Sequence, residues 1–514
     1  MIPIKFKARM KEMLANEYDD FIASYDRANY HSLRINPLKH STNTSDIDIK
    51  DSCNPLSKEV QHLENALGCS LTPVRWCNTG FYYDENIRPG KHPLHEAGAY
   101  YIQEASAMAP AEYLDINPGE TVLDLCAAPG GKSTQIAGKM NGEGLLISNE
   151  IIPSRAKILS ENIERMGIRN AVVTNESSER LAHFFPEFFD KIMVDAPCSG
   201  EGMFRKNTTA CDEWSTDNVI NCAKRQAEIL DNAATMLKTG GRIVYSTCTF
   251  SPEENEGTII HFLLRNPDFF LVDVKKYDGM SDGSVSFAKM CLSDTDVTKA
   301  NGFLQTIPYT IRMLPHRLKG EGHFVAVLEK KPFHETTESD APKKLKRIKG
   351  VKDKSIKEYL NFADSFFINK PAGTHIMFGD NLYVVPEICP PLDGIKVLRA
   401  GLLLGTFLKN RFEPAHSIAL ALSPSDVRNV INISLPVSEN HNITENSGVT
   451  ENVNTTQNSD ADIIYKYING ETFSYDGEKG WYLIAVNGYS IGFGKLSSGI
   501  MKNHYPKGLR KSLK

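Results

Sequence analysis

Between residues 120 and 330, short apolar runs rich in β-branched residues alternate with segments of helical periodicity. Five such runs are TVLDL, GLLISNE, NAVVTN, KIMVDAP and GRIVYS, which begin at residues 121, 144, 170, 191 and 241. After the second run, Leu159, Ile163 and Met166 follow the spacing of one helical face, and Gly167 ends the pattern. This alternation predicts an α/β fold with a doubly wound, mostly parallel sheet that binds ligands at the carboxyl ends of its strands.

The length of 514 residues predicts roughly three or four domains. The expected units are an N-terminal module at 1–110, the α/β core at 111–330, a linker at 331–364, a mixed α/β domain at 365–437, a disordered linker at 438–462 and a β-rich unit at 463–514. The stretch 438–462 is predicted to be disordered because it is rich in Asn, Thr and Glu and has low complexity.

Composition and charge narrow the class of protein. No apolar run approaches the roughly 20 residues that span a bilayer, and the N-terminus lacks the apolar block of a secretory signal, so we expect a cytoplasmic protein without membrane contact. None of the ten cysteines forms a C-x-x-C pair, so no zinc site is expected. The net charge of −5 disfavours nonspecific nucleic-acid binding, but the basic runs 343–357 and 502–514 favour contact with a polyanion.

The loop DLCAAPGGKST, residues 124–134, ends like a phosphate-binding P-loop. A P-loop requires G-x-x-x-x-G-K-[ST], but Cys126 stands at the position of its first glycine and Pro129 stiffens its centre. A P-loop ATPase is therefore the disfavoured alternative. In the favoured alternative, Gly130 and Gly131 bring the backbone of a nucleotide-type loop close to its ligand. Glu150 then supplies the acid that such a loop needs about 20 positions later for ribose hydroxyls.

Two cysteines follow strand-like runs and are therefore expected at one edge of the predicted sheet. Cys198 lies in DAPCSGEG after the fourth run, close to Asp195, and Cys248 lies in STCTF after the fifth. The sequence SPEE, residues 251–254, has the pattern of a capping box and predicts that a helix begins there. A helix N-terminus lowers the pKa of a nearby thiol and favours the thiolate.

A thiolate, a nearby acid and an adenosine-type cofactor suit one reaction in particular. Carbon 5 of cytosine is a poor nucleophile, but addition of a thiolate to C6 turns the ring into an enamine that can attack an electrophilic methyl group. A carboxyl group that hydrogen-bonds N3 would stabilise the developing charge. The residues alone do not decide which of the two cysteines is the nucleophile.

These motifs resemble those of the Nop/Sun-type RNA cytosine-C5 methyltransferases, which use S-adenosylmethionine. The resemblance is carried by DLCAAPGGKSTQ, by NE at 149–150, by DAPCSGEGMFRK and by YSTCTF. SLRINPLK, VRWCNTGFYY and HEAGAYYIQEASAM are similar to the N-terminal module of the bacterial ribosomal RNA branch. LRAGLLLGTFLKNRFEPAHSIALAL and GWYLIAVNGYSIGFGKL resemble the C-terminal region of RsmF-like enzymes. The resemblance implies a Rossmann-like, S-adenosylmethionine-dependent core with an N-terminal α+β module and a C-terminal PUA-like, β-rich RNA-binding region.

The resemblance also implies roles that spacing leaves open. Cys248 would attack C6, Cys198 would assist release of the methylated product, and Asp195 would contact the base or the cofactor. Glu150 is expected at the ribose of the cofactor, and Arg155 is a further cofactor candidate. The loop residues implied for the methionine part of the cofactor are Cys126, Ala127, Ala128, Pro129, Gly130, Gly131 and Lys132.

One position departs from the family's pattern. The family usually has an aspartate after the third strand, near the adenine, where this chain has Ser177 preceded by Glu176. Either the acid has moved by one position to Glu176, or backbone groups make the adenine contact.

The implied substrate is a cytosine in RNA, and the implied target is 16S ribosomal RNA of the small subunit. The base must leave its stack to be reached, which favours single-stranded loops or an assembling subunit. We expect a monomer that does not act on DNA. A transfer RNA cytosine-C5 methyltransferase and a catalytically inactive, RNA-binding assembly factor are the alternatives, and the intact Cys248, Cys198, Asp195 and Glu150 argue against the second.

Overall fold

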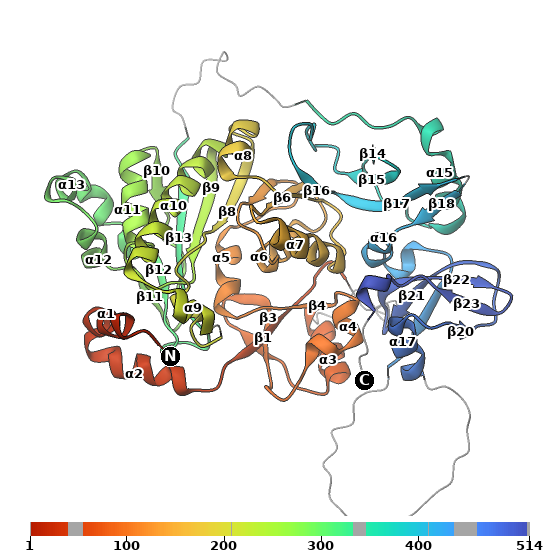
Figure 1. Ribbon diagram of the computed structural model, residues 1–514, viewed down its shortest axis with the longest axis horizontal. Helices are drawn as coiled ribbons and strands as arrows, with labels where there is room; N and C mark the ends of the chain where they lie inside the picture. Colours follow the sequence, from red (N-terminus) through yellow and green to blue (C-terminus); the bar gives the residue numbers. More distant parts are fainter. Residues whose placement is uncertain are drawn as a thin grey trace, which may run out of the picture.

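The computed structural model describes six stretches of the chain, residues 2–39, 55–206, 208–332, 346–409, 411–435 and 460–510. The predicted disordered stretch 438–462 lies outside them except for its last three residues. In Figure 1 the N-terminal module lies below the α/β core, and the C-terminal sheets lie to the right of it. Within these six stretches, no helix is both long enough and apolar enough to cross a bilayer.

The core is built on a ten-stranded sheet in the order β11-β12-β13-β9-β8-β5-β6-β7-β16, with β10 paired to β13. Its parallel strands are β5 (Thr121–Asp124), β6 (Leu145–Asn149), β7 (Ala171–Thr174), β8 (Phe189–Asp195) and β9 (Leu237–Thr247). The remaining strands are β10 (Phe269–Leu271), β11 (Met280–Asp282), β12 (Ile311–Met313), β13 (His323–Lys330) and β16 (Val397–Ala400). The strand order reverses between β5 and β8, which is where a doubly wound sheet binds its ligand. The predicted fold class is confirmed.

Helices cover both faces of this sheet. On one face Leu123 packs with α8 (Ser178–Phe184), α10 (Thr216–Met236) and α11 (Glu256–Arg265). On the other face the adjacent residue, Val122, packs with α6 (Gly131–Met140) and α7 (Pro153–Arg165). Because both faces are buried, the strands read as nearly continuous apolar runs, and ligands approach at the edge where the strands end.

The N-terminal module contributes a second sheet and a pair of helices that packs on the core and not on this sheet. Its sheet has the order β2-β3-β1-β4 and consists of β1 (His31–Ile35), β2 (Thr72–Val74), β3 (Cys77–Tyr83) and β4 (Tyr100–Ile102). Helices α1 (Ile4–Leu14) and α2 (Tyr18–Ala23) pack instead on the core. Phe6 contacts Trp214 edge to face, and Phe21 contacts Phe250 in the same way. The first helices therefore support the segment that follows Cys248.

The C-terminal region forms two further sheets. The first consists of β14 (Thr374–Phe378), β15 (Asn381–Val385), β17 (Leu402–Leu408) and β18 (Arg411–Pro414). The second, in the order β19-β21-β22-β23-β20, consists of β19 (Val430–Ile433), β20 (Phe473–Ser474), β21 (Gly480–Val486), β22 (Tyr489–Ser497) and β23 (Ile500–Asn503). Strand β16 lies between these elements in sequence but pairs antiparallel with β7 of the core (Figure 1). The C-terminal region thus extends the core sheet, which the domain prediction did not include.

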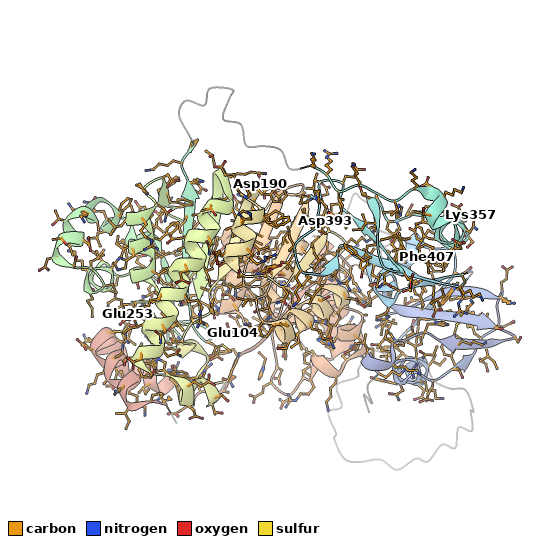
Figure 2. All side chains as sticks on the ribbon, turned by 45° about the horizontal axis from the view of Figure 1, so that its top comes forward. Glu104, Asp190, Glu253, Lys357, Asp393 and Phe407 are labelled. Carbon is orange, nitrogen blue, oxygen red and sulfur yellow. The ribbon has the colours of Figure 1, made fainter. Side chains whose placement is uncertain are left out.

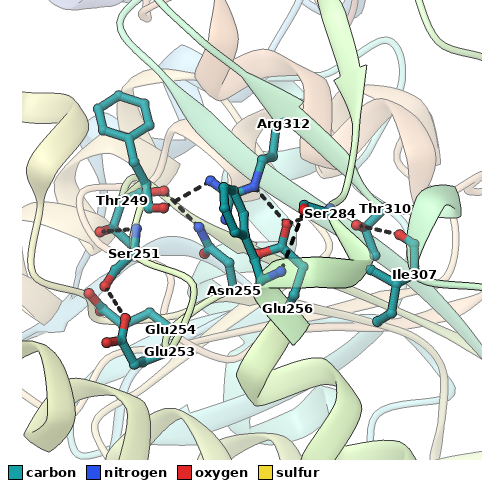
Figure 3. A network of polar contacts seen from close by, with 12 residues as sticks. Thr249, Ser251, Glu253, Glu254, Asn255, Glu256, Ser284, Ile307, Thr310 and Arg312 are labelled. Atoms are coloured by element: carbon teal, nitrogen blue, oxygen red, sulfur yellow. Dashed lines mark hydrogen bonds and ion pairs between the residues drawn. The ribbon is translucent and has the colours of Figure 1, made fainter. Parts of the chain in front are cut away.

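The helix predicted to begin at the capping box 251–254 begins later, at Glu256. The Ser251 hydroxyl donates to Glu253 Oε2 at 2.8 Å (Figure 3), and Arg9 of α1 holds the same carboxylate oxygen at 2.6 Å. In the pattern S-x-x-E the capping acid is Glu254, and this carboxylate accepts from the Ser199 amide and the Gln226 side chain instead. No side chain of the described residues caps α11. Tertiary contacts have therefore overridden a local capping signal.

The second half of the predicted linker 331–364 also differs from the expectation. Within it, η9 (Asp353–Ile356) and α15 (Lys357–Phe366) are helical. Ile356 and Tyr359 are buried in the core of the mixed domain. Their helical spacing gives this segment an apolar face, so the domain packs residues that precede position 365.

Candidate active site

A cavity of about 1010 Å³ lies at the edge of the sheet where the parallel strands end. It is lined by eight of the predicted site residues, namely Cys126, Ala128, Glu150, Arg155, Ser177, Asp195, Cys198 and Cys248. The volume is at the upper end of the range of about 300–1,000 Å³ that is common for ligand pockets. The remaining predicted residues, Ala127, Pro129, Gly130, Gly131 and Lys132, belong to the loop and helix start behind this wall.

The loop after β5 is held in place by close packing. Gly130 has a φ of 116° and precedes α6, and a Cβ there would lie 3.3 Å from a methyl carbon of Leu159. A Cβ on Gly131 would lie 3.3 Å from the Gln103 side-chain nitrogen, which comes from the N-terminal module. The two glycines therefore allow α7 and the N-terminal module to approach the loop. The close approach to a ligand that the sequence predicts for them stays a prediction.

An arginine of the N-terminal module fixes the same loop from behind. Arg34 on β1 is fully buried. It donates to the Gly131 carbonyl at 3.1 Å, to the Thr134 hydroxyl at 2.7 Å and to the Gln103 side-chain carbonyl at 2.7 Å. Sequence reasoning did not find Arg34, because its partners lie about one hundred positions away.

Asp124, at the end of β5, is a buried carboxylate with spare hydrogen-bonding capacity. Its Oδ2 accepts a hydrogen bond from the Ser133 hydroxyl at 2.6 Å, whereas its Oδ1 is buried without a partner among the described residues. Burial raises the pKa of Asp124 to about 7. A buried acceptor without a donor indicates a ligand contact or a proton on the carboxyl group.

Glu150 is buried at the end of β6 and is oriented by two donors. Arg155 lies 3.2 Å from Glu150 Oε2, and the Ile152 amide donates to Glu150 Oε1 at 2.9 Å. Arg155 also donates to the Ala128 carbonyl at 2.8 Å. Each carboxylate oxygen can still accept a further hydrogen bond. Arg155 therefore joins the loop after β5 to Glu150.

Ser177 and Glu176 both line the cavity, and both side chains are already engaged. The Ser177 hydroxyl caps α8 by accepting from the Arg180 amide at 3.2 Å. Glu176 accepts from the Arg180 side chain and, at 2.8 Å, from the Lys396 amide just before β16. Asn149, which belongs to the NE pair of the sequence but was given no role there, donates through its side-chain amide to the carbonyls of Leu125 and Glu176 and so joins three strand ends.

The two predicted thiols meet at the opposite side of the cavity. Cys198 Sγ lies 3.2 Å from Cys248 Sγ. The hydrogen bond with Cys248, together with burial, raises the pKa of the Cys198 thiol well above its usual value. Cys198 is therefore a neutral S–H group at neutral pH. The helix N-terminus predicted beside Cys248 does not lie there, since α11 begins eight positions later.

Asp195 and Lys132 form an ion pair beside the thiols. Lys132 Nζ lies 2.8 Å from Asp195 Oδ2, and the Ser246 hydroxyl donates to Asp195 Oδ1 at 2.7 Å. Burial opposes the charge on Asp195, but Lys132 and the surrounding donors still hold its pKa below the ordinary value. Lys132, expected among the cofactor-loop residues, thus points to the carboxylate at the end of β8.

A buried set of side chains, which we call the thiol network, joins the two cysteine loops. Glu254 accepts from the Ser199 amide at 2.9 Å and from the Gln226 amide at 2.8 Å. Glu201 accepts from the Thr249 hydroxyl and the Phe250 amide, each at 2.9 Å. Burial raises the pKa of Glu254 to about 7. The thiol network consists of Ser199, Glu201, Gln226, Thr249 and Glu254, none of which was predicted to be a site residue.

Models of known families match the chain in four places. Residues 111–329 match the 16S rRNA methyltransferase RsmB/F, and residues 2–105 match the N-terminal domain of the 16S rRNA methyltransferase RsmF. Residues 361–422 match the first C-terminal domain of the RsmF rRNA methyltransferase, and residues 456–511 match the PUA domain of methyltransferase RsmF.

Individual relatives agree with these matches. The ribosomal RNA small subunit methyltransferase F of Vibrio vulnificus is 33% identical over 521 residues, covering 99% of this chain and 97% of its own. The protein of that name from Shewanella frigidimarina is 33% identical over 423 residues, 80% of each chain. Among solved structures, a methyltransferase homolog protein from Pyrococcus horikoshii has a TM-score of 0.51 and 28% identity, covering 63% of this chain and 94% of its own. The chain therefore belongs to the RsmF family of S-adenosylmethionine-dependent ribosomal RNA methyltransferases.

Proposed function

We propose that the chain methylates carbon 5 of a cytosine in 16S ribosomal RNA through a covalent bond between Cys248 and C6 of the base. The observation that carries this proposal is the 3.2 Å separation of the Cys198 and Cys248 sulfur atoms beside the Asp195–Lys132 ion pair. Two thiols and a carboxylate are what C5 methylation requires, because the ring must be activated at C6 and later released.

The cavity fits S-adenosylmethionine, which supplies an electrophilic methyl group when bound. Its wall offers the Glu150 carboxylate as an acceptor suited to a ligand with hydroxyl groups. Asp124, whose Oδ1 has no partner among the described residues, is buried next to Leu125 of this wall. The start of α6, after Gly130, offers amide donors suited to a carboxylate. We assign the loop 126–132 to the methionine part, Glu150 to the ribose and the region of Ser177 and Glu176 to the adenine.

Cys248 and the ion pair act on the base. The Cys248 thiolate adds to C6, a sulfur–carbon bond forms, and the electrons of the C5–C6 double bond make C5 nucleophilic. Asp195 and Lys132 provide an acceptor and a donor for the polar edge of the cytosine ring and for the charge that develops on it.

Cys198 acts in the release of the methylated base from Cys248. After C5 has been methylated, a water molecule takes its proton, the C5–H electrons restore the C5–C6 double bond, and the bond between Cys248 Sγ and C6 breaks with the sulfur leaving as a thiolate. The neutral Cys198 S–H group lies within hydrogen-bonding distance and stabilises that thiolate by donating to it. This polarity, with Cys248 as nucleophile and Cys198 as donor, agrees with the roles implied by the sequence motifs.

Ribosomal RNA is favoured over transfer RNA as the substrate, because the matching families and relatives are named for it along nearly the whole chain. The target base has to leave its stack to reach thiols at the edge of the sheet. The PUA-type unit would hold phosphates and RNA shape, which set position rather than sequence.

The proposal is tested by incubating the protein with methyl-labelled S-adenosylmethionine and, separately, small ribosomal subunits, naked 16S RNA and transfer RNA. We expect label in 5-methylcytidine of 16S RNA, from the subunit or the naked RNA, and none in transfer RNA. Label in transfer RNA alone would show that transfer RNA, and not 16S RNA, is the substrate. Label in a nucleoside other than 5-methylcytidine would exclude the C5 chemistry, and the absence of label from all three would exclude the activity.

A further inference from the structure

A pair of tyrosines and a lysine forms a surface cluster on the N-terminal module, outside the cavity. The Tyr30 and Tyr82 rings lie edge to face with their centroids 6.3 Å apart. The Lys319 ammonium lies 5.9 Å from the centroid of each ring. The three residues come from the residue before β1, from the end of β3 and from the loop before β13.

The geometry of this cluster is fixed by the backbone. The Tyr82 hydroxyl donates to the Lys319 carbonyl at 2.8 Å, which joins the N-terminal sheet to the loop of the core. Next to Lys319 in the same loop, the Glu321 amide donates to Glu104 at 3.0 Å, and Glu104 lies just after β4 (Figure 2). Two bonds from the module therefore hold the loop that carries Lys319.

The cluster is accessible and carries uncompensated charge. Both tyrosines are partly exposed, and Lys319 is exposed. No carboxylate of the described residues pairs with Lys319. The contact of a cation with two aromatic rings is stabilising in itself. Because Lys319 also remains open to solvent, its ammonium group can still bind an anion.

The loop leads directly to the thiols. Gly322 is three residues after Lys319, which limits the distance between their Cα atoms to about 11 Å. A Cβ on Gly202 would lie 2.9 Å from the Gly322 carbonyl oxygen and 3.1 Å from that of Cys248. Gly202 thus touches both the end of the Lys319 loop and the backbone of the proposed nucleophile.

Two basic side chains share one carboxylate in the same loop. Arg205 contacts both oxygens of Glu321, at 2.8 Å and 2.9 Å, and Lys206 lies 3.3 Å from the same carboxylate. The Arg205 side chain is buried, whereas Lys206 and Lys319 are exposed. The two exposed lysines give this part of the surface cations that suit a phosphate backbone.

We propose that Tyr30, Tyr82 and Lys319 form a stacking platform for an unpaired RNA base that flanks the target cytosine. This inference rests on the proposed function, because it assumes an RNA strand at the thiols. The base stacks on an aromatic face, and Lys319 contacts the adjoining phosphate, so the platform holds the strand while the target base enters the site. Stacking on aromatic side chains tolerates any base, so the platform contributes affinity and position without selecting sequence.

The platform is tested with the full chain and a short single-stranded RNA that contains one cytosine flanked by 2-aminopurine. Stacking on a tyrosine quenches the fluorescence of 2-aminopurine. Tyr30→Leu keeps the volume but removes the aromatic face, and Lys319→Gln removes the charge. Each substitution should weaken binding about tenfold, and Tyr30→Leu should also abolish the quenching. Tyr30→Trp should restore both.

The matched control is Tyr83→Leu. Tyr83 is adjacent to Tyr82 on β3, and successive side chains of a strand point to opposite faces of the sheet. This variant should bind and quench as the unaltered protein does. The platform is excluded if Tyr30→Leu retains full affinity and quenching, or if only Lys319→Gln weakens binding, which would mean simple attraction of phosphates. Methyl transfer to 16S RNA by the unaltered protein, measured in parallel, separates failure of the platform from failure of the proposed function.

Discussion

The cavity wall built by the ends of β5 and β6 and the wall built by the two cysteine loops both contain buried carboxylates, but they use them differently. Asp124, buried behind the first wall at the end of β5, accepts one hydrogen bond, and its other carboxylate oxygen has no partner among the described residues. Glu201, in the second, accepts three hydrogen bonds, from Trp214, Thr249 and Phe250. The carboxylate at the first wall can still accept a hydrogen bond from a ligand. The carboxylate at the second wall is fully engaged in holding the cysteine loops.

This contrast follows from the chemistry assigned to each wall. A cofactor must bind and leave in every cycle, so the groups that receive it have to be free when it is absent. Two sulfur atoms that act in turn on one bond, 3.2 Å apart, must keep their relative position, because a displacement of about 1 Å can reduce the rate of an enzyme about 100-fold.

The largest effect is expected from breaking the second wall with Glu201→Ala. The substitution leaves three buried donors without an acceptor, and each costs about 1–3 kcal/mol. We expect the free energy of unfolding to fall by roughly 3–5 kcal/mol and methyl transfer to fall about 100-fold or more. Urea denaturation and a methyl-transfer assay measure the two. Glu213→Ala, which removes an exposed carboxylate from the same region, should leave both unchanged. A Glu201→Ala variant with the stability and rate of Glu213→Ala would contradict the account of the thiol network.

A smaller effect is expected from loosening the first wall at Arg34. Arg34→Met removes the donors that hold the Gly131 carbonyl and the Thr134 hydroxyl while keeping the buried chain apolar. One charged hydrogen bond is worth about 1.5–3 kcal/mol, so we expect KM for S-adenosylmethionine to rise about tenfold or more, with a smaller change in kcat. The control is Arg27→Met, an exposed arginine of the same module. If the rise in KM appears for RNA instead, Arg34 positions the substrate rather than the cofactor loop.

The subtlest effect concerns Asp124 and pH. Its pKa is about 7 in the folded chain against an ordinary value of 3.8, so the folded chain binds this proton more tightly than the unfolded chain. The free energy of unfolding should therefore decline as pH rises from about 4 to about 7, by up to about 4 kcal/mol for this group. Asp124→Asn should remove that part of the decline, and denaturation at several pH values would show it.

The control for this comparison is Glu143→Gln, because Glu143 is an exposed carboxylate just before β6, at the opposite edge of the sheet from Asp124. Its stability should follow the pH profile of the unaltered protein. A profile of Asp124→Asn that runs parallel to the unaltered profile would mean that Asp124 is ionised in the folded chain, and that its free oxygen is satisfied by solvent.

The sheet and its two cysteine loops could be predicted because their signals are local. Each parallel strand is an apolar run of a few residues, and parallel strands end at one edge, so Cys198 and Cys248 were expected at the same edge of the sheet. The glycine pair of the cofactor loop could be recognised in the same way. A close approach of the backbone requires glycine, and glycine is visible in the local sequence.

The rest depends on partners far away in the chain. Strand β16 pairs with β7 across more than two hundred positions, and Ser199 and Gln226 engage Glu254, the acid of the capping box that the local pattern predicted. Lys132 stands in a motif that suggests phosphate binding, and only the fold brings it to Asp195. Such contacts carry no signal within a short window of sequence.

The central claim, that Cys248 forms the covalent bond and Cys198 releases it, is tested by trapping the adduct. Cys198→Ala and Cys248→Ala variants are incubated with small ribosomal subunits or 16S RNA and S-adenosylmethionine, and the products are separated under denaturing conditions. We predict a covalent protein–RNA adduct with Cys198→Ala, because the bond to C6 forms but the leaving sulfur is not stabilised, and none with Cys248→Ala. An adduct with Cys248→Ala and none with Cys198→Ala would reverse the two roles and contradict the mechanism.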